Sequence, residues 1–159
     1  MPSKLLAAMQ PPLPPPHTPP HTHTNAPFPY TPPSRAAWRT DATYPMPGAP
    51  SSLRIHSGFH VLWNSSSMAP TFAAAYARLA AAHPGGATYV VGHSMGGALA
   101  HLCALDLRAA YDPQDLRVVT FGSPRVGNAA FAEFFADVVP GSWRFTHGRD
   151  IVPSLPPTL

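Results

Sequence analysis

The sequence predicts an α/β fold, a mostly parallel sheet with helices on both of its faces. Three short apolar runs with β-branched and aromatic residues are typical of buried strands, at residues 88–91, 116–122 and 143–146. Helical patterns over residues 95–103 and 129–138 separate these runs. Because strands and helices alternate in close succession, we expect right-handed crossovers and parallel strand pairing.

Proline divides the 159-residue chain into two parts. Of its 23 prolines, 15 precede residue 51. Residues 1–33 are therefore predicted to be a Pro-rich, disordered leader, and residues 34–159 a globular domain. Because proline fixes φ and lacks an amide donor, residues 10–33 favour polyproline II or disorder. Their P-x-x-P spacings fit an SH3 or WW module, and the alternative is a leader that is only solvated.

Composition excludes several classes of partner. The formal net charge is +3, only 11% of residues are charged and no basic run occurs, so no nucleic-acid partner is expected. Cys103 is the single cysteine, which rules out an intrachain disulfide and permits a reducing compartment. No secretory signal or membrane span is evident, which favours an intracellular location. No metal-ligand spacing occurs, and no cofactor is expected.

The segment before the central sheet carries weaker signals. Residues 34–41 are short and amphipathic, with Trp38 as their largest apolar side chain. Residues 43–52 have the Pro, Gly and Ser content of a loop. β-branched and aromatic residues predict a strand over residues 53–56, which we expect to be broken at Gly58.

A helix is predicted next, over residues 69–82. Pro70 lies in its first turn, where proline is tolerated, and residues 83–86, His-Pro-Gly-Gly, end it. Its larger apolar side chains recur at helical spacing, at Phe72, Tyr76, Leu79 and Ala80.

Between the first buried strand and the helix that follows lies a G-x-S-x-G sequence, Gly92-His93-Ser94-Met95-Gly96. The chain must pass from strand to helix in a tight turn, with the backbone of Ser94 strained and the glycines keeping side chains clear. Such a turn presents the Ser94 hydroxyl above the sheet edge. It also directs the Met95 amide toward an oxyanion formed on an attacked acyl group. The alternative is an N-cap serine with glycines that serve only packing.

The last part of the chain completes the sheet. After a turn at residues 111–113, a strand and a helix capped at Asn128 lead to the third strand and then to Asp150. The inner face of that helix is predicted to hold Phe131, Phe134, Phe135 and Val138. Because ligand chemistry in parallel sheets gathers at the carboxyl ends of strands, Ser94 and Asp150 are expected at the same edge.

With these elements in place, residues 34–159 resemble the class 3 lipases, the fungal-lipase-like branch of the α/β-hydrolase fold. Five stretches carry the resemblance, in the order that the family shows: residues 38–41 (WRTD), 55–59 (IHSGF), 91–100 (VGHSMGGALA), 120–128 (TFGSPRVGN) and 144–157, with RFTH, DIVP and LPP.

The resemblance implies a serine esterase that cleaves acyl-lipid esters through an acyl-enzyme, at a membrane or lipid-droplet surface. Ser94 would be the nucleophile, and Asp150 would orient and stabilise the catalytic histidine. The Met95 backbone N–H would be one oxyanion donor. A family lid lies near residues 34–41, with Trp38 as its membrane-facing anchor.

Two family features are not found at their expected places. The catalytic histidine of the family lies some tens of residues beyond the DIVP segment, whereas this sequence ends at Leu159. The segment that normally supplies the first oxyanion donor is replaced by residues 30–33, Tyr-Thr-Pro-Pro, and prolines offer no amide. His147 and His93 are interpreted as structural, His56 and His60 as supports of the site, and His101 as a core residue.

Several interpretations therefore stay open. The chain is either a part of an esterase whose histidine lies elsewhere in the protein, or a catalytically inactive lipase-like module that binds lipid or a partner. A third interpretation is that the domain does not fold stably, because the sheet lacks edge strands on both sides. For Asp150, the alternative role is an ion pair with Arg144 or Arg149. Arg125 and Asn128 are expected to fix the loop after the second buried strand.

Overall fold

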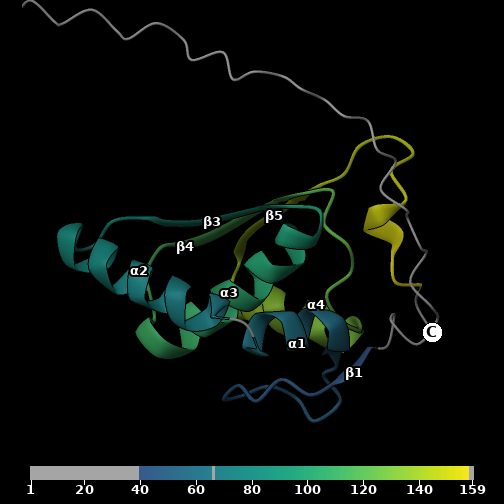
Figure 1. Cartoon of the computed structure of the whole chain (residues 1–159), viewed down its shortest axis with the longest axis horizontal. Coiled ribbons are helices and arrows are strands. Elements are labelled where there is room, and N and C mark those ends of the chain that lie inside the picture. The colour runs from purple at the N-terminus through teal and green to yellow at the C-terminus, as the bar shows by residue number, and fades with distance from the viewer. Residues whose placement is uncertain (1–39, 66, 158–159) are drawn as a thin grey trace, which may run out of the picture. The chain divides into compact units, whose positions relative to one another are not determined.

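A computed structural model describes residues 40–65 and 67–157. The leader at 1–33, Trp38 and residues 30–33 lie outside them. The helices are α1 (Ser57–Ser65), α2 (Met68–Ala82), α3 (Met95–Tyr111), α4 (Ala129–Val138) and the 3-10 helix η2 (Val152–Ser154); the strands are β1 (Thr40–Ala42), β2 (Ile55–His56), β3 (Thr88–His93), β4 (Leu116–Phe121) and β5 (Gly141–Phe145) (Figure 1).

The central sheet is parallel, as predicted. Its strand order is β3-β4-β5, with Val91 opposite Val119 and Val119 opposite Trp143 across the three strands. The strands end together, because His93, Phe121 and Phe145 form the last matched row. β1 and β2 pair antiparallel in a separate two-stranded sheet.

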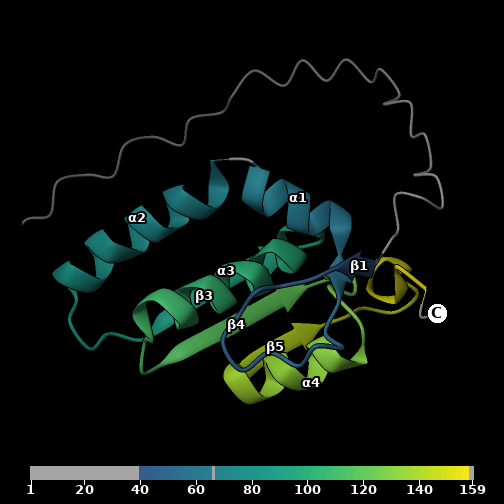
Figure 2. The same cartoon turned by 90° about the horizontal axis from the view of Figure 1, so that it is seen from below.

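The four α-helices of the described residues lie on one side of this sheet, as Figures 1 and 2 show. α3 packs directly on β3 and β4, and α4 packs against α3. Leu116, Val118 and Thr120 of β4 point toward these helices and are buried. We call this side of the sheet its covered face. α3 is the buried helix that its small and aliphatic residues predict, and none of the described helices is long and apolar enough to span a bilayer.

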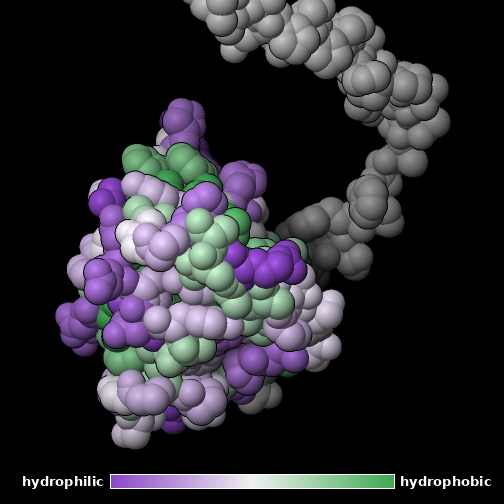
Figure 3. All heavy atoms as spheres, turned by 90° about the vertical axis from the view of Figure 1, so that its left-hand side faces the viewer, coloured by the Kyte–Doolittle hydropathy of each residue, from purple (hydrophilic) through white to green (hydrophobic). Residues whose placement is uncertain are grey.

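The opposite side of the sheet, its open face, carries Tyr89, Val91, Phe121, Trp143 and Phe145. Tyr89 is 56% exposed and Val91 62% exposed. The prediction that the first strand is buried on both faces is therefore wrong for the described residues, because no helix among them covers this side. In Figure 3, hydrophobic atoms lie near the top of the molecule, the side on which Figure 1 shows the sheet.

The predicted strand over residues 53–56 ends at His56 as expected but begins only at Ile55, and Gly58 is not a break but part of the first turn of α1, which begins at Ser57. The Nδ1 atom of His56 accepts a hydrogen bond from the Gly58 N–H at 3.0 Å and so caps the first turn. Phe59 and Trp63, four residues apart, are the buried side chains of α1. That spacing is the helical signal, and it outweighs one glycine near a helix start.

α2 forms as predicted, beginning one residue earlier, but none of its residues is buried. Leu79, at 60% exposed, points away from the core. Met68, Ala69 and Tyr76 are partly buried against the core. Two aromatic pairs add to this contact: Phe72 lies 5.7 Å from Trp63 and Tyr76 lies 5.0 Å from Tyr111, measured between ring centroids. α2 thus lies loosely over the end of α3.

α4 spans the predicted residues, and Asn128 is its N-cap. The Asn128 Oδ1 atom accepts from the Phe131 N–H at 3.1 Å, and Phe131 and Phe135 are buried on the inner face, as predicted. The third strand begins two residues earlier than predicted and ends one residue earlier. These differences lie within the ordinary uncertainty of element ends.

Candidate functional site

Ser94 adopts the strained backbone that the G-x-S-x-G sequence predicts. It lies between the end of β3 and the start of α3 with φ 52° and ψ −127°, a conformation in which a residue with a Cβ is strained. Its N–H donates to the Phe121 carbonyl at 2.9 Å, and its own carbonyl accepts from the Gly97 N–H at 2.9 Å. These bonds hold the turn on both sides, although Ser94 makes no side-chain cap bond to α3. The N-cap interpretation of Ser94 therefore has no hydrogen bond to support it.

The glycines around Ser94 allow α3 to approach the sheet. A Cβ on Gly92 would lie 2.3 Å from the carbonyl oxygen of Gly96, and one on Gly97 would lie 2.7 Å from the Ser123 Cβ. Both distances are shorter than real Cβ contacts allow, whereas a Cβ on Gly96 would meet nothing within 4 Å. Two of the three glycines are thus required by packing, and the tight turn at Ser94 depends on them.

The structure brings Ser94 and Asp150 to the same edge of the sheet. Ser94 is bonded to Phe121 at the end of β4, and the next residue, Gly122, adopts φ 56°. The Asp150 Oδ2 atom lies 3.0 Å from the place where a Gly122 Cβ would be. Asp150 reaches this place because its N–H closes a turn with the His147 carbonyl at 3.1 Å.

Asp150 is exposed and is not used in an ion pair among the described residues. Its Oδ1 atom accepts from the Val152 N–H at 3.0 Å. The Arg144 guanidinium donates instead to the carbonyls of Ser123 and Pro153, each at 2.7 Å, and burial lowers its pKa. The alternative of an Arg144–Asp150 or Arg149–Asp150 pair is therefore not what the structure shows.

The histidines of the described residues range from buried to exposed. His101 is buried in α3, where its Nδ1–H donates to the Gly97 carbonyl at 2.7 Å and its ring lies 4.6 Å from that of Phe135, as expected of a core residue. Burial lowers the pKa of His101. His93 is exposed, and its Nε2 atom lies 3.9 Å from the same Gly122 Cβ position that Asp150 approaches. No histidine of the described residues is hydrogen-bonded to Asp150.

Arg125 and Asn128 have the structural roles that the sequence predicts. The Arg125 backbone N–H donates to the Leu155 carbonyl at 2.6 Å, and its guanidinium donates to the carbonyls of Ser154 and Pro156. The Asn128 side chain also donates to the Ser52 carbonyl at 2.8 Å. These bonds fasten the segment after β4, and with it the loop that carries Asp150.

One polar cluster was not predicted from the sequence. Asp106 lies on α3 and accepts hydrogen bonds from the Trp63 indole N–H, at 2.6 Å, and from the Tyr44 hydroxyl. Burial and the neighbouring Asp106 carboxylate raise the pKa of Tyr44. The signal that could have found it is a lone acid, Asp106, within the apolar run of a buried helix.

Comparison with known proteins agrees with this geometry. Residues 29–159 match the family described as Lipase (class 3). A secreted mono- and diacylglycerol lipase of Fusarium solani is 43% identical over 105 residues, which cover 66% of this chain and 30% of that protein.

Solved structures give the same result. The crystal structure of a lipase from Rhizopus microsporus var. chinensis matches with a TM-score of 0.65 and 34% identity, over 74% of this chain and 40% of that one. A triacylglycerol lipase whose catalytic centre is described as a serine protease triad matches with a TM-score of 0.62 and 35% identity, over 74% and 44%. The chain thus spans less than half the length of these relatives, and the α/β-hydrolase type of fold is confirmed.

Proposed function

Because the chain belongs to the class 3 lipase family, we propose that it carries the nucleophile half of a carboxylic-ester hydrolase acting on acyl lipids. The observation that supports this most strongly is the backbone of Ser94, held at φ 52° between β3 and α3. A serine in this conformation stands clear of the sheet with the first turn of a helix behind it. Four N–H groups at a helix start lack intrahelical acceptors, so Met95 N–H has a free direction toward an anion.

The reaction would proceed through an acyl-enzyme. The Ser94 Oγ atom attacks the ester carbonyl carbon, its proton passes to a base, and the oxyanion is stabilised by Met95 N–H. The alcohol then leaves with the proton that the base returns to it, and water, which gives up a proton to the same base, cleaves the acyl-serine ester to release the carboxylic acid and restore Ser94. Asp150 lies beside Gly122, which follows β4, and Ser94 follows the neighbouring strand β3 at the same sheet edge. At this position a carboxylate would orient the histidine that serves as base.

We propose further that this base is not one of the nine histidines in these 159 residues. His101 is enclosed in the core, and no histidine of the described part bonds to Asp150. The base would then come from polypeptide that is not part of this sequence. Without it, a triad loses orders of magnitude in rate, so the isolated chain is expected to turn over slowly.

The substrate class proposed is acylglycerol esters, since the relatives that match are described as mono-, di- and triacylglycerol lipases. Trp38 is proposed as the anchor of a lid that meets a membrane or lipid-droplet surface. The Pro-rich residues 1–33 are proposed to be a separate leader from the domain at 34–159, with SH3 or WW modules as candidate partners.

A second function is favoured by the same absence of a histidine bonded to Asp150 in the described residues. A chain without its base would act as a lipase-like module that binds lipid or a partner protein without cleaving it.

Hydrolysis of p-nitrophenyl butyrate, measured beside co-sedimentation with a diacylglycerol emulsion, tests the two functions. Slow turnover that is lost in Ser94→Ala and kept in Ser52→Ala, a matched change at an exposed serine, supports the hydrolase. Saturable emulsion binding that is equal in wild type and Ser94→Ala, without turnover, supports the binding module. A folded chain that shows neither contradicts both.

A further inference from the structure

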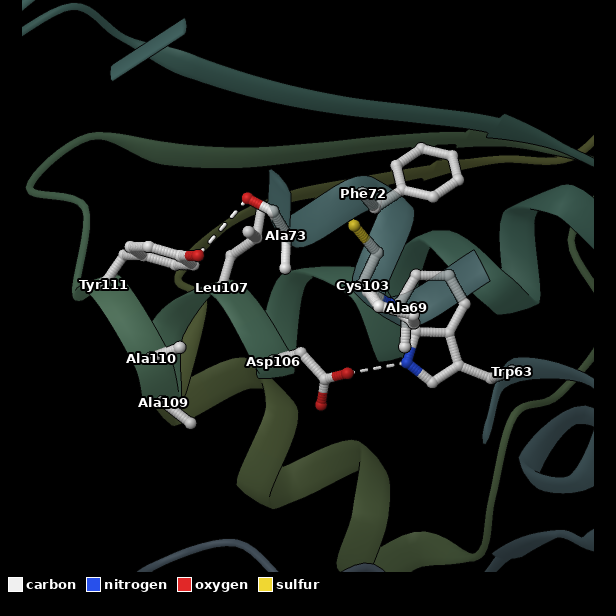
Figure 4. Close-up of a pocket in the computed structure, with 11 residues that line it drawn as sticks. Trp63, Ala69, Phe72, Ala73, Cys103, Asp106, Leu107, Ala109, Ala110 and Tyr111 are labelled. Carbon is white, nitrogen blue, oxygen red and sulfur yellow. Dashed lines mark hydrogen bonds between the residues drawn. The ribbon is translucent and has the colours of Figure 1, made fainter. Parts of the chain in front are cut away.

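A cavity of about 400 Å³ lies between α1, α2 and the end of α3 (Figure 4). Asp106, on its wall, follows Met95 by three turns of α3, which places this part of the cavity roughly 16 Å along the helix axis from the tight turn at Ser94. It is therefore separate from the proposed nucleophile. Its volume lies within the range of small-molecule sites.

The walls of this cavity are apolar and partly aromatic. Trp63 and Phe72 stand on one side and Tyr111 on the other, where its hydroxyl donates to the Ala73 carbonyl at 3.3 Å. Four small side chains leave the space between them open: Ala69, Ala73, Ala109 and Ala110. The cavity exists because the aromatic pairs Phe72–Trp63 and Tyr76–Tyr111 hold α2 over the rest of the molecule, while the α2 side chains at Ala69 and Ala73 are too short to fill the space.

Asp106 brings a carboxylate to this apolar wall. Among the described residues, two groups donate hydrogen bonds to it, Trp63 and Tyr44, and both are neutral. No ion pair to Asp106 occurs among the described residues, and the basic residue nearest to it on α3, Arg108, bonds to Asp112 and to the Pro113 carbonyl. Two hydrogen bonds thus solvate the charge of Asp106, but no cation neutralises it.

A carboxylate accepts about four hydrogen bonds, so two acceptor positions of Asp106 remain beyond those taken by Trp63 and Tyr44. A negative charge among apolar groups is costly unless it is paired. A cation that enters the cavity gains a charge-assisted hydrogen bond, and aromatic walls attract cations rather than anions. The other acidic group on the wall, the Cys103 thiol, stays protonated and neutral, because burial raises its pKa to about 12.

We propose that this cavity binds an organic ammonium ion with an aromatic or alkyl body. The ammonium group lies beside the Asp106 carboxylate, and the apolar body lies against Trp63, Phe72 and the alanines of α2. Charge complementarity selects this class over fatty acids and other organic anions, which Asp106 repels. The site binds its ligand without involving Ser94.

Titration of the 159-residue chain with 2-phenylethylammonium tests this site, with 2-phenylethanol as the neutral ligand of nearly the same shape. The Trp63 indole N–H resonance, assigned by its loss in Trp63→Phe, reports binding. We expect the cation to bind about tenfold more tightly than the alcohol, the ratio that 1.4 kcal/mol of charge pairing gives. Equal affinities for the two ligands would overturn the proposal.

Two variants separate charge from shape. Asp106→Asn removes the charge but keeps a carbonyl acceptor, and should bring the ratio of the two affinities close to one. Ala73→Leu fills the cavity and should weaken both ligands, whereas Ala77→Leu, exposed on the same helix and away from the cavity, should weaken neither. A cation preference that survives in Asp106→Asn contradicts the proposal. If Asp106→Asn does not fold, Ala73→Leu serves as the test. Binding of the cation that is unchanged in Ala73→Leu would contradict the proposed site.

Discussion

The two faces of the central sheet carry similar residues but meet different surroundings. Val118 and Val119 are neighbours on β4, yet Val118 is fully buried beneath α3, while Val119 lies in the row that crosses the open face. On β3, Val90 packs against the core and Val91 is exposed. The difference shows that a β-branched run identifies a strand, whereas its burial is decided by what the rest of the chain lays over it.

The largest expected change in stability comes from truncating a side chain that is buried on the covered face. Leu102 is fully buried in α3, and Leu102→Ala should lower the free energy of unfolding by about 2–5 kcal/mol, because the lost side chain leaves a cavity. Leu79→Ala, the same change at an exposed position of α2, should alter it by about 0.5 kcal/mol or less. Urea unfolding measures both. Similar losses in the two variants would contradict the packing described.

A smaller effect compares the faces directly. Val118→Ala should destabilise by about 2 kcal/mol, since it removes two buried methyl groups. Val91→Ala should fall within about 0.5 kcal/mol of wild type. If thermal unfolding shows Val91→Ala to be as costly as Val118→Ala, then the open face is covered in solution.

The cap of α4 should matter by about 1 kcal/mol. Asn128→Ala removes the acceptor for the Phe131 N–H and the bond to the Ser52 carbonyl. Ser67, at the start of α2, makes no side-chain cap bond, so Ser67→Ala is the matched control with an expected change near zero. Equal unfolding midpoints in urea for the two variants would show that the Asn128 cap is not stabilising.

The free energy of unfolding should decrease as the pH is lowered, because of His101 on the covered face. Burial lowers its pKa below the value of about 6.5 that it has when unfolded. The unfolded state therefore binds the proton first, and stability is lost as pH falls from about 6.5 toward the folded pKa, by up to about 1.4 kcal/mol per pH unit.

The measurement is urea unfolding at pH 7 and pH 5. His101→Gln should reduce the difference in the free energy of unfolding between the two pH values. His93→Gln, at an exposed position on the open face, serves as the control and should keep that difference. The linkage to His101 is wrong if His101→Gln keeps the full dependence on pH.

Local features of the chain were predictable from the sequence. The parallel strands, α3, α4 with its Asn128 cap, and the strained turn at Ser94 all follow from patterns within a few residues. Each depends on short-range rules for turns, caps and periodicity. The order of strands along the chain also placed Ser94 and Asp150 at one edge.

Features that depend on distant partners were not predictable. Gly58 suggested a break, but Phe59 and Trp63 pack as one helical face. The apolar residues of α2 suggested a packed stripe, yet Leu79 is exposed. The position of Asp106, within an apolar helix, gave no indication of Trp63 and Tyr44, which come from separate segments to bond it.

The most direct test of the central claim, that Ser94 is the nucleophile and lacks its base here, is labelling with a fluorophosphonate probe with and without added imidazole, read by intact mass and peptide mapping. If the base is absent, as we propose, added imidazole can take its place, so the predicted result is one adduct on Ser94 that imidazole accelerates and that Ser94→Ala lacks. Adducts on other serines, or no adduct on a folded chain at any imidazole concentration, would contradict the nucleophile. Rapid labelling of Ser94 without imidazole would contradict the absence of a base.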